Sequence, residues 1–417
     1  MDFIEEVWPY NRSLTGAGTQ KTLLAIRERL PDLEIIQVPS GSKCWDWTVP
    51  KVWNLEEGYI MDSEGRKVVS SNSNNLHVAS YSNPVDCLLT LDELKEYIFT
   101  KPDLPDAIPY RTKYYDNSWA FCMSENQKNK LTDQKYRVVI NSSLEEGFLE
   151  YGQLKVQGKS ENEIIFSTYV CHPSLANNEL SGPAVGIGIG SFLSKLNSYY
   201  SYRILFVPET IGTLAFLSTN FDELKKKFVS GHILTCLGDD RMWSFLPSLT
   251  GIEMCDVMAK RVLVNSKINY VQYPFLERGS DERQYCSPLI NLPVSSVMRS
   301  KYGVYPEYHT SLDNLTLISE SALKDSLKFY EDLILEYERN RIPIARVYGE
   351  PMLSKRSLRN PTGGGTLSIG EIAISQILAY ADGRHDTKEL SRMLGISSDD
   401  LKDILELCLQ HELIEFR

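Results

Sequence analysis

The sequence has little of what marks nucleic-acid-binding, membrane or secreted proteins. Its 417 residues carry 44 basic against 55 acidic side chains, a formal charge of -11, whereas binding to nucleic acid depends on clustered Lys and Arg. The most apolar stretches, IIFSTYVCH and AVGIGIGSFL, fall well short of the ~20 residues of a membrane-spanning helix. The eight cysteines are scattered without a CxxC pair, so neither a zinc knuckle nor a disulfide framework is indicated. We therefore expect no nucleic-acid partner and no membrane partner.

The amino-terminal segment and the composition predict a folded cytoplasmic protein. MDFIEEVWPYNRSLTG is acidic and lacks the basic and apolar regions of a signal peptide, and the cysteines are interpreted as reduced thiols. The length allows two or three domains, each large enough to bury a core without a metal. A metal ion in this protein would therefore serve chemistry rather than folding.

Composition and periodicity divide the chain into a main domain and an insert. Residues 44–130 are rich in Trp, Tyr, Asn and Pro and predict a small β-rich domain, whose aromatic residues form either a packed core, which we favour, or a ligand platform. From residue 150 onward, apolar strands alternate with helices, which is typical of an α/β sheet with parallel strands. The main domain is predicted to consist of residues 1–43 and 131–350.

Residues 351–417 are predicted to form a linker and a winged-helix-like domain. The linker is the basic, Gly-rich segment KRSLRNPTGGGTL, and the helices that follow are separated by a G-I-S-S turn. From Glu371 onward the tail has ten acidic and five basic residues, which opposes DNA binding and favours packing or a protein partner. Its apolar helix faces, which include Ile374, Ile377, Leu401 and Leu405, make a homodimer one expectation.

Polar residues follow several predicted strands, which is where α/β sheets commonly carry their sites. His172 ends the strand IIFSTYVCH and is either a metal ligand or a structural histidine. Glu209 ends YRILFVPE and is either a general base or a helix-capping acid. His309 lies in EYHTSLDNL, before a helix that we expect to begin at Ser311 and Asp313.

Seven segments occur in a recognisable order: NRSLTGAGT, WDWTVPKVWN, DAIPYRTKYYDNSWAFC, STYVCHPSLANNELSGPA, FVPETIG, GSDERQYCSP and YPEYHTSLDNL. In these segments the chain resembles the M28-type zinc aminopeptidases. It resembles still more closely the bacterial aminopeptidase-like domain proteins associated with polysaccharide-biosynthesis loci. The resemblance implies an α/β fold with an M28 aminopeptidase-like mixed sheet flanked by helices. An inserted small β-rich domain and a C-terminal winged-helix-like domain complete the implied architecture.

The resemblance also implies a metal site. It places the zinc ligands on His172, Asn178 and His309, and the general base on Glu209. The two-zinc peptidases usually have a glutamate ligand directly after the base, and Thr210 stands there in this chain. One zinc ion is therefore expected rather than two.

Asn178 departs from the family pattern, in which an aspartate bridges the metals. An amide oxygen is a weaker zinc ligand than a carboxylate, so a neighbouring acid is expected to substitute. Glu179, which follows Asn178, and Asp239, which follows HILTCLG, are the two candidates. The residues alone leave the third ligand open.

Candidate substrate-binding residues cluster in the later motifs: Arg278, Asp281, Arg299, Tyr302 and Tyr308. Arginine suits carboxylate or phosphate groups on a substrate or a sugar nucleotide, while internal ion pairs are an equally weighted interpretation.

The main hypothesis is a zinc-dependent hydrolase of an amide bond in a peptide or in an N-acyl or aminoacyl sugar. Zinc would polarise the carbonyl group while Glu209 moves the proton, and the resemblance implies a role in cell-surface polysaccharide biosynthesis. The alternative is an impaired aminopeptidase fold that acts as a metal- or ligand-binding scaffold. Asn178 and Thr210 favour this alternative, and retention of the two histidines and the glutamate opposes it. A regulator governed by the acidic tail is a third hypothesis, which the charge of the tail disfavours.

Overall fold

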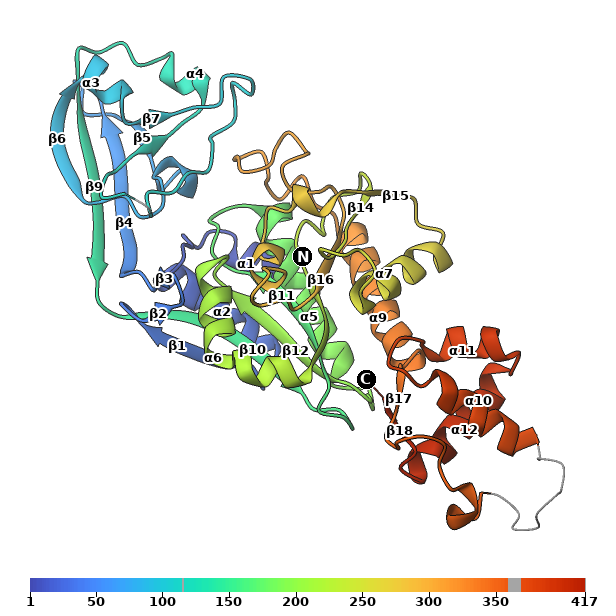
Figure 1. Cartoon of the computed structure of the whole chain (residues 1–417). Coiled ribbons are helices and arrows are strands. Elements are labelled where there is room, and N and C mark those ends of the chain that lie inside the picture. The colour runs from blue at the N-terminus through green and yellow to red at the C-terminus, as the bar shows by residue number, and fades with distance from the viewer. Residues whose placement is uncertain (115, 359–368, 417) are drawn as a thin grey trace. The chain divides into compact units, whose positions relative to one another are not determined.

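The structure is a computed structural model of the chain that describes residues 1–114, 116–358 and 369–416 (Figure 1). It consists of two compact units, Met1–Glu331 and Asp332–Arg417. From residue 359 onward, the predicted linker KRSLRNPTGGGTL lies outside the described residues. In the described ranges, every helix is either too short or too polar to traverse a lipid bilayer.

The first unit is built on a mixed sheet that has eight strands among the described residues, in the order β1-β10-β12-β11-β13-β16-β14-β15. The strands are β1 (Glu34–Pro39), β10 (Phe148–Val156), β11 (Glu163–Tyr169), β12 (Ser201–Val207), β13 (Phe228–Ile233), β14 (Trp243–Leu246), β15 (Tyr270–Gln272) and β16 (Val294–Met298). Strands β12, β11, β13 and β16 are parallel neighbours, and antiparallel strands flank them on both sides. Every residue of β11 is buried, as expected of a central parallel strand.

Helices cover both faces of this sheet. They are α1 (Asp2–Val7), α2 (Ala17–Arg29), α5 (Ser181–Leu193), α6 (Ile211–Lys227), α7 (Met254–Asn265), α8 (Glu282–Tyr285) and α9 (Glu320–Arg339). Helix α6 packs on the face that presents Leu205 and Val207, and α5 approaches the opposite face at Phe206. At the start of α5, a Cβ atom on Gly182 would lie 2.5 Å from the carbonyl oxygen of Leu234. Glycine is required there because α5 begins in contact with the sheet.

The inserted region forms a second sheet, which is antiparallel and has the order β5-β4-β9-β6. The elements of the whole inserted region are β2 (Lys43–Cys44), β3 (Trp47–Thr48), β4 (Val52–Met61), β5 (Lys67–Ser70), η1 (Asn75–His77), β6 (Val85–Thr90), α3 (Leu91–Lys95), β7 (Ile98–Phe99), β8 (Phe121–Cys122), α4 (Glu125–Lys128) and β9 (Lys135–Glu145). The predicted D-S-E-G turn joins β4 to β5, and Thr90 caps α3 in a capping box with Glu93. Strand β9 belongs to this sheet although it lies beyond residue 130 (Figure 1).

The described part of the second unit contains the end of α9, the short 3-10 helix η4, three further α-helices and a two-stranded antiparallel sheet. Its elements are β17 (Pro343–Ala345), η4 (Leu353–Arg356), α10 (Ile369–Tyr380), α11 (Thr387–Leu394), α12 (Ser398–Gln410) and β18 (Ile414–Phe416). Gly395 ends α11 in the left-handed conformation and Ser397 caps α12, so the G-I-S-S segment forms the predicted turn. Ile374, Ile377, Leu401 and Leu405 are buried within the chain, and the homodimer stays a prediction.

Candidate active site

A cavity of about 300 Å³ lies where residues that follow β11 and β12 meet the insert. His172, Glu209 and His309, which come from three separate sequence motifs, all line it. The remaining lining residues are Leu14, Trp47, Ser80, Tyr81, Tyr110, Arg111, Thr112, Tyr114, Cys171, Thr210 and Ile211. The fold thus joins the three strongest sequence candidates in one space.

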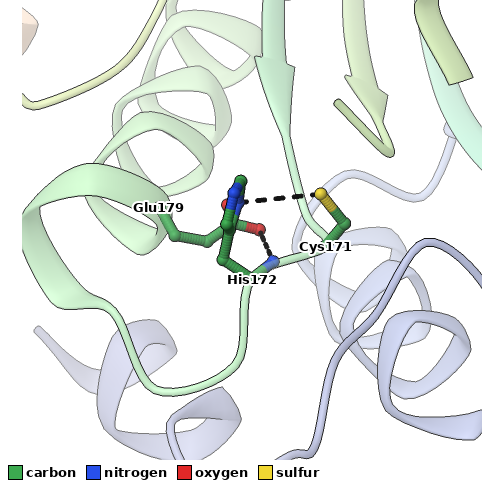
Figure 2. Close-up of side chains that lie close together, drawn as sticks. All are labelled: Cys171, His172 and Glu179. Atoms are coloured by element: carbon green, nitrogen blue, oxygen red, sulfur yellow. Dashed lines mark hydrogen bonds and ion pairs between the residues drawn. The ribbon is translucent and has the colours of Figure 1, made fainter. Parts of the chain in front are cut away.

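His172 is fixed from several directions. Its Nδ1 lies 2.5 Å from Oε2 of Glu179, and its backbone N–H donates to Oε1 of the same carboxylate at 2.9 Å (Figure 2). The carbonyl oxygen of His172 accepts a hydrogen bond from Nε of the buried Arg12 at 3.0 Å. The Glu179 carboxylate engages Nδ1, and the other ring nitrogen, Nε2, lies 3.5 Å from Oε2 of Glu209.

The pKa of His172 reflects two opposing effects. Burial of the ring lowers the pKa, but the neighbouring Cys171 and Glu179 outweigh burial and raise it well above its usual value. The raised pKa favours an imidazolium that lies between the Glu179 and Glu209 carboxylates, and a metal ion would have to displace the Nε2 proton to bind the ring.

Cys171, His172 and Glu179 bring three potential metal-ligand atoms within 4.8 Å of one another (Figure 2). Both oxygens of Glu179 are occupied by His172, and Sγ of Cys171 lies 3.7 Å from the same Nδ1. Burial raises the pKa of Cys171 to about 11, which keeps the thiol protonated at neutral pH, whereas a metal binds the thiolate. This arrangement supports the His172 ring better than it would hold an ion.

Glu209 lies two residues beyond the end of β12, next to a strained residue. Thr210 has a φ of +66°, which is unfavourable for a β-branched side chain. The buried carboxylate of Asp281 holds this conformation by accepting from the Thr210 backbone N–H at 2.8 Å and from the Thr213 hydroxyl at 2.7 Å. Burial raises the pKa of Glu209, while His172 opposes the increase. A raised carboxyl pKa suits a general base that must accept a proton near neutral pH.

His309 lies in the loop before α9, beside the His172 ring. The ring centroids of the two histidines are 5.3 Å apart, and Tyr110 of the insert lies within 5.2 Å of both centroids. Tyr308 stacks on His309 at 3.9 Å. Burial lowers the pKa of His309 well below its usual value, and His172 and Arg111 add to the effect. His309 is therefore a neutral imidazole, the form that binds metals.

The expected helix at Ser311 and Asp313 is not formed, and the next helix is α9, which begins at Glu320. Asp313 instead accepts hydrogen bonds from the backbone N–H groups of residues 176, 177 and 178. Those residues belong to η2 (Ala176–Leu180), a π-helical turn between β11 and α5. Asp313 thus acts as a long-range cap for the turn that carries Asn178 and Glu179.

Asn178 is fully enclosed, and its amide has one unused atom. Its Nδ2 donates to the Tyr169 hydroxyl at 3.0 Å, and the Tyr169 ring lies 5.4 Å from the ring of His172. Its Oδ1 is buried and accepts no hydrogen bond from the described residues. A buried amide oxygen without a donor is costly unless something else binds it.

The other predicted site residues lie outside the lining of the cavity. Both carboxylate oxygens of Asp239 accept hydrogen bonds from Ser300. They also accept from the Asn177 side-chain amide and from the Arg241 backbone N–H. Arg299 donates to the Asp239 carbonyl group at 2.7 Å.

The remaining candidates from the later motifs are also engaged elsewhere. Arg278 lies over the Phe275 ring, and the Tyr302 hydroxyl bonds to Glu282. Both oxygens of Asp281 are bound at the start of α6, and burial together with Glu209 raises its pKa to about 7. None of these three residues lines the cavity.

Comparison with known sequences decides the family. Residues 1–340 match the family described as a domain of unknown function, DUF4910. The chain belongs to the DUF4910 family. Residues 341–416 match a winged helix-turn-helix family, which confirms the predicted C-terminal domain.

This DUF4910 chain is similar to a protein from Clostridium acetobutylicum. A curated protein from that bacterium is 42% identical over 416 residues, which cover 99% of this chain and 95% of the relative. It carries the provisional name of a polysaccharide biosynthesis protein with an aminopeptidase-like domain. A crystal structure of a provisionally assigned peptidase from the same species has 42% identity and a TM-score of 0.82, and covers 100% of this chain and 95% of that one.

More distant solved structures confirm the M28 aminopeptidase-like fold of this DUF4910 chain. The zinc aminopeptidase BSAP from Bacillus subtilis has 12% identity and a TM-score of 0.58, over 80% of this chain and 94% of its own. An M28 peptidase precursor from Shewanella amazonensis has 11% identity and a TM-score of 0.53, over 80% and 91%. At these identities the likeness concerns the fold alone.

Sequence reasoning missed the part of the site that comes from the insert. Tyr110 and Arg111 line the cavity, whereas the aromatic residues of the insert were expected chiefly to pack with one another. Trp53 and Tyr136 do form such a core. The segment DAIPYRTKYYDNSWAFC was noted only as a family motif, and no local periodicity distinguishes its cavity residues from its core residues.

Proposed function

We propose that the chain is a metal-dependent hydrolase that cleaves an amide bond in a peptide or in an N-acyl or aminoacyl sugar. The observation that carries the proposal is the approach of His172 Nε2 to the Glu209 carboxylate, 3.5 Å apart, in a cavity that also contains His309. The provisional name of the Clostridium acetobutylicum relative supports a role in polysaccharide biosynthesis. All eight cysteines are free thiols, which supports a reducing, cytoplasmic compartment.

The residues fit one zinc ion. Two imidazoles that share a tetrahedral zinc at ~2.0–2.1 Å have centroids roughly 5 Å apart, and those of His172 and His309 are 5.3 Å apart. The unpartnered Oδ1 of Asn178 offers a third donor near Tyr169. Glu209 is the sole carboxylate among the described lining residues, so the cavity lacks the acidic groups that a second ion would require.

A zinc ion held by His172, His309 and Asn178 would supply Lewis-acid polarisation of the scissile carbonyl group and of the attacking water. The residues of the chain perform the proton transfers. Glu209 removes a proton from the water and returns it to the leaving nitrogen, as its raised pKa favours. Glu179 holds the His172 ring, and Asp281 holds the backbone beside Glu209.

Metal content tests this proposal most directly. Untagged protein purified without chelators, and analysed by inductively coupled plasma mass spectrometry, should contain about one zinc per chain. His172→Ala and His309→Ala should each lose the ion, whereas His385→Ala, a change in the second unit, should retain it. An amide-substrate screen would follow, with Glu209→Gln as the inactive control. Wild-type protein that stays empty after zinc is added would refute the proposal.

A further inference from the structure

Arg111 is an exposed cation in the cavity wall that has no carboxylate partner among the described residues. Its guanidinium lies 5.5 Å from the centroid of the Phe99 ring, and it forms no ion pair with any residue in the described part of the chain. Lys113 lies over the same ring at 5.4 Å, but it pairs with Asp116 at 3.5 Å and does not line the cavity. A guanidinium in such a cation–π contact still has N–H groups at its edge that can donate to an anion.

The backbone of Arg111 is held on both sides. The carbonyl group of Arg111 accepts from the Ser80 N–H at 3.1 Å, and the preceding Tyr110 N–H donates to the His309 carbonyl group at 2.8 Å. The position of Arg111 is thus tied directly to the loop that carries His309. A group bound by the Arg111 side chain would lie in the same cavity as His309 and Glu209.

The charged residues that line the cavity indicate whether it attracts a cationic or an anionic group of a substrate. Among the described lining residues, Arg111 is the lone Lys or Arg and Glu209 the lone carboxylate. An ammonium group would be repelled by Arg111, and Glu209 is already required as the base. An anionic group is attracted by Arg111 and can accept two parallel hydrogen bonds from it.

Aromatic rings form the wall beside Arg111. Trp47 and Tyr114 are stacked with their centroids 6.5 Å apart, and Tyr81 meets the edge of Tyr114 at 5.4 Å. This wall, made of Trp47, Tyr81 and Tyr114, suits a sugar ring or another flat apolar surface.

We propose that the cavity selects an amide whose non-reacting part carries a carboxylate or a phosphate, which Arg111 binds while the aromatic wall contacts the rest of the molecule. This inference rests on the proposed function for the identity of the reacting bond. A free terminal amine is not required in such a substrate, and N-acylated anionic molecules, including anionic amino-sugar derivatives, are its class.

The test compares matched probes on protein that has been stripped of metal with EDTA and then dialysed free of the chelator, so that neither coordination to a metal nor the EDTA carboxylates contribute. N-acetylglycine is paired with N-acetylglycinamide, and N-acetylglucosamine 1-phosphate with N-acetylglucosamine. Isothermal titration calorimetry on the full chain should show at least one of the two anionic probes binding about tenfold or more tightly than its neutral partner. The preference should vanish in Arg111→Gln, shrink in Arg111→Lys and persist in the matched control Lys113→Gln.

The two pairs of probes separate a carboxylate substrate from a phosphate substrate. Equal affinities within both pairs, no binding of either anion, or a preference that survives in folded Arg111→Gln would overturn the inference. Because the measurement requires neither metal nor turnover, it can succeed even where the hydrolase proposal fails, and the two failures are distinguishable.

Discussion

The carboxylate of Glu179 holds His172 at two points, with Oε2 2.5 Å from the ring Nδ1 and Oε1 2.9 Å from the backbone nitrogen. Glu179 therefore orients the His172 ring. Because both of its oxygens are engaged in this way, Glu179 is not free to replace the aspartate ligand that the aminopeptidases have at the position of Asn178. The lone oxygen of Asn178 is left to complete the metal site that we propose.

Glu179→Ala should lower zinc affinity by about 10- to 100-fold, because the His172 ring loses the group that orients it. Glu179→Gln keeps one acceptor oxygen and should cause a smaller loss. Competition with a fluorescent chelator measures both effects. Asp256→Asn, which alters another buried carboxylate outside the cavity, serves as the control. If Glu179→Gln abolished binding as completely as His172→Ala, Glu179 would itself be a ligand.

Asn178→Asp should tighten zinc binding on the order of tenfold, since a charged oxygen replaces a neutral one at the same position. Without zinc, the same substitution places an uncompensated carboxylate in a buried site and should lower the melting temperature. Zinc should then raise the melting temperature of the variant more than that of the wild type. Differential scanning calorimetry with and without the ion measures both shifts, and an unchanged zinc response would exclude Asn178 as a ligand.

Asp281→Ala should destabilise the first unit by about 1–3 kcal/mol, because the Thr210 N–H and the Thr213 hydroxyl both lose their buried acceptor. Asp281→Asn retains an acceptor for Thr210 and should cost less. Urea denaturation provides the comparison, with exposed Asp240→Ala expected within about 0.5 kcal/mol of wild type. A loss no larger than that of the Asp240 variant would argue against the role of Asp281 in holding the start of α6.

His232 should make the protein less stable in acid. Its ring is buried against Phe166, and burial lowers its pKa to about 3. In the unfolded chain a histidine titrates near 6.5, so the unfolded state takes up a proton first as the pH falls. The stabilising contribution of neutral His232 is therefore complete above about pH 6.5 and declines toward pH 3, by up to about 1.4 kcal/mol per pH unit.

The measurement is the free energy of unfolding in urea at pH 7, 6 and 5 for wild type and His232→Phe. Phenylalanine has a similar shape and cannot take up a proton. The free-energy difference between wild type and variant should shift by about 2 kcal/mol toward the variant from pH 6.5 to pH 5. Parallel curves would mean that another group causes the acid sensitivity.

The predictable part of the site followed from local patterns. The strand β11, which ends at Tyr169 shortly before His172, is visible as a run of apolar residues, and the start of α5 is visible in the small residues Ser181 and Gly182. The parallel strands then bring the residues after β11 and β12, including Glu209, to the same edge of the sheet. For this reason His172 and Glu209, which are far apart in sequence, could be expected to share one cavity.

The site residues that the sequence did not predict correctly depend on contacts between segments that are far apart in the chain. Asp313 has the sequence signature of a helix start, yet its carboxylate is used 135 or more residues away, by the turn at Asn178. Asp239 follows a strand as a metal ligand might, but Ser300 and neighbouring groups satisfy its oxygens. The cavity residues Tyr110 and Arg111 are set by contacts with Ser80 and His309, which no local periodicity encodes.

The pairing of the insert with the His309 loop also determines when the site first exists. Ile108 donates its N–H to the hydroxyl of Ser311, 203 positions later in the chain. At the ~5–20 residues per second of protein synthesis, the ribosome needs roughly 10–40 s to add that stretch. The nascent protein therefore passes through a long interval in which residues 108–111 have been made and their partner has not, and the cavity is among the last features to form.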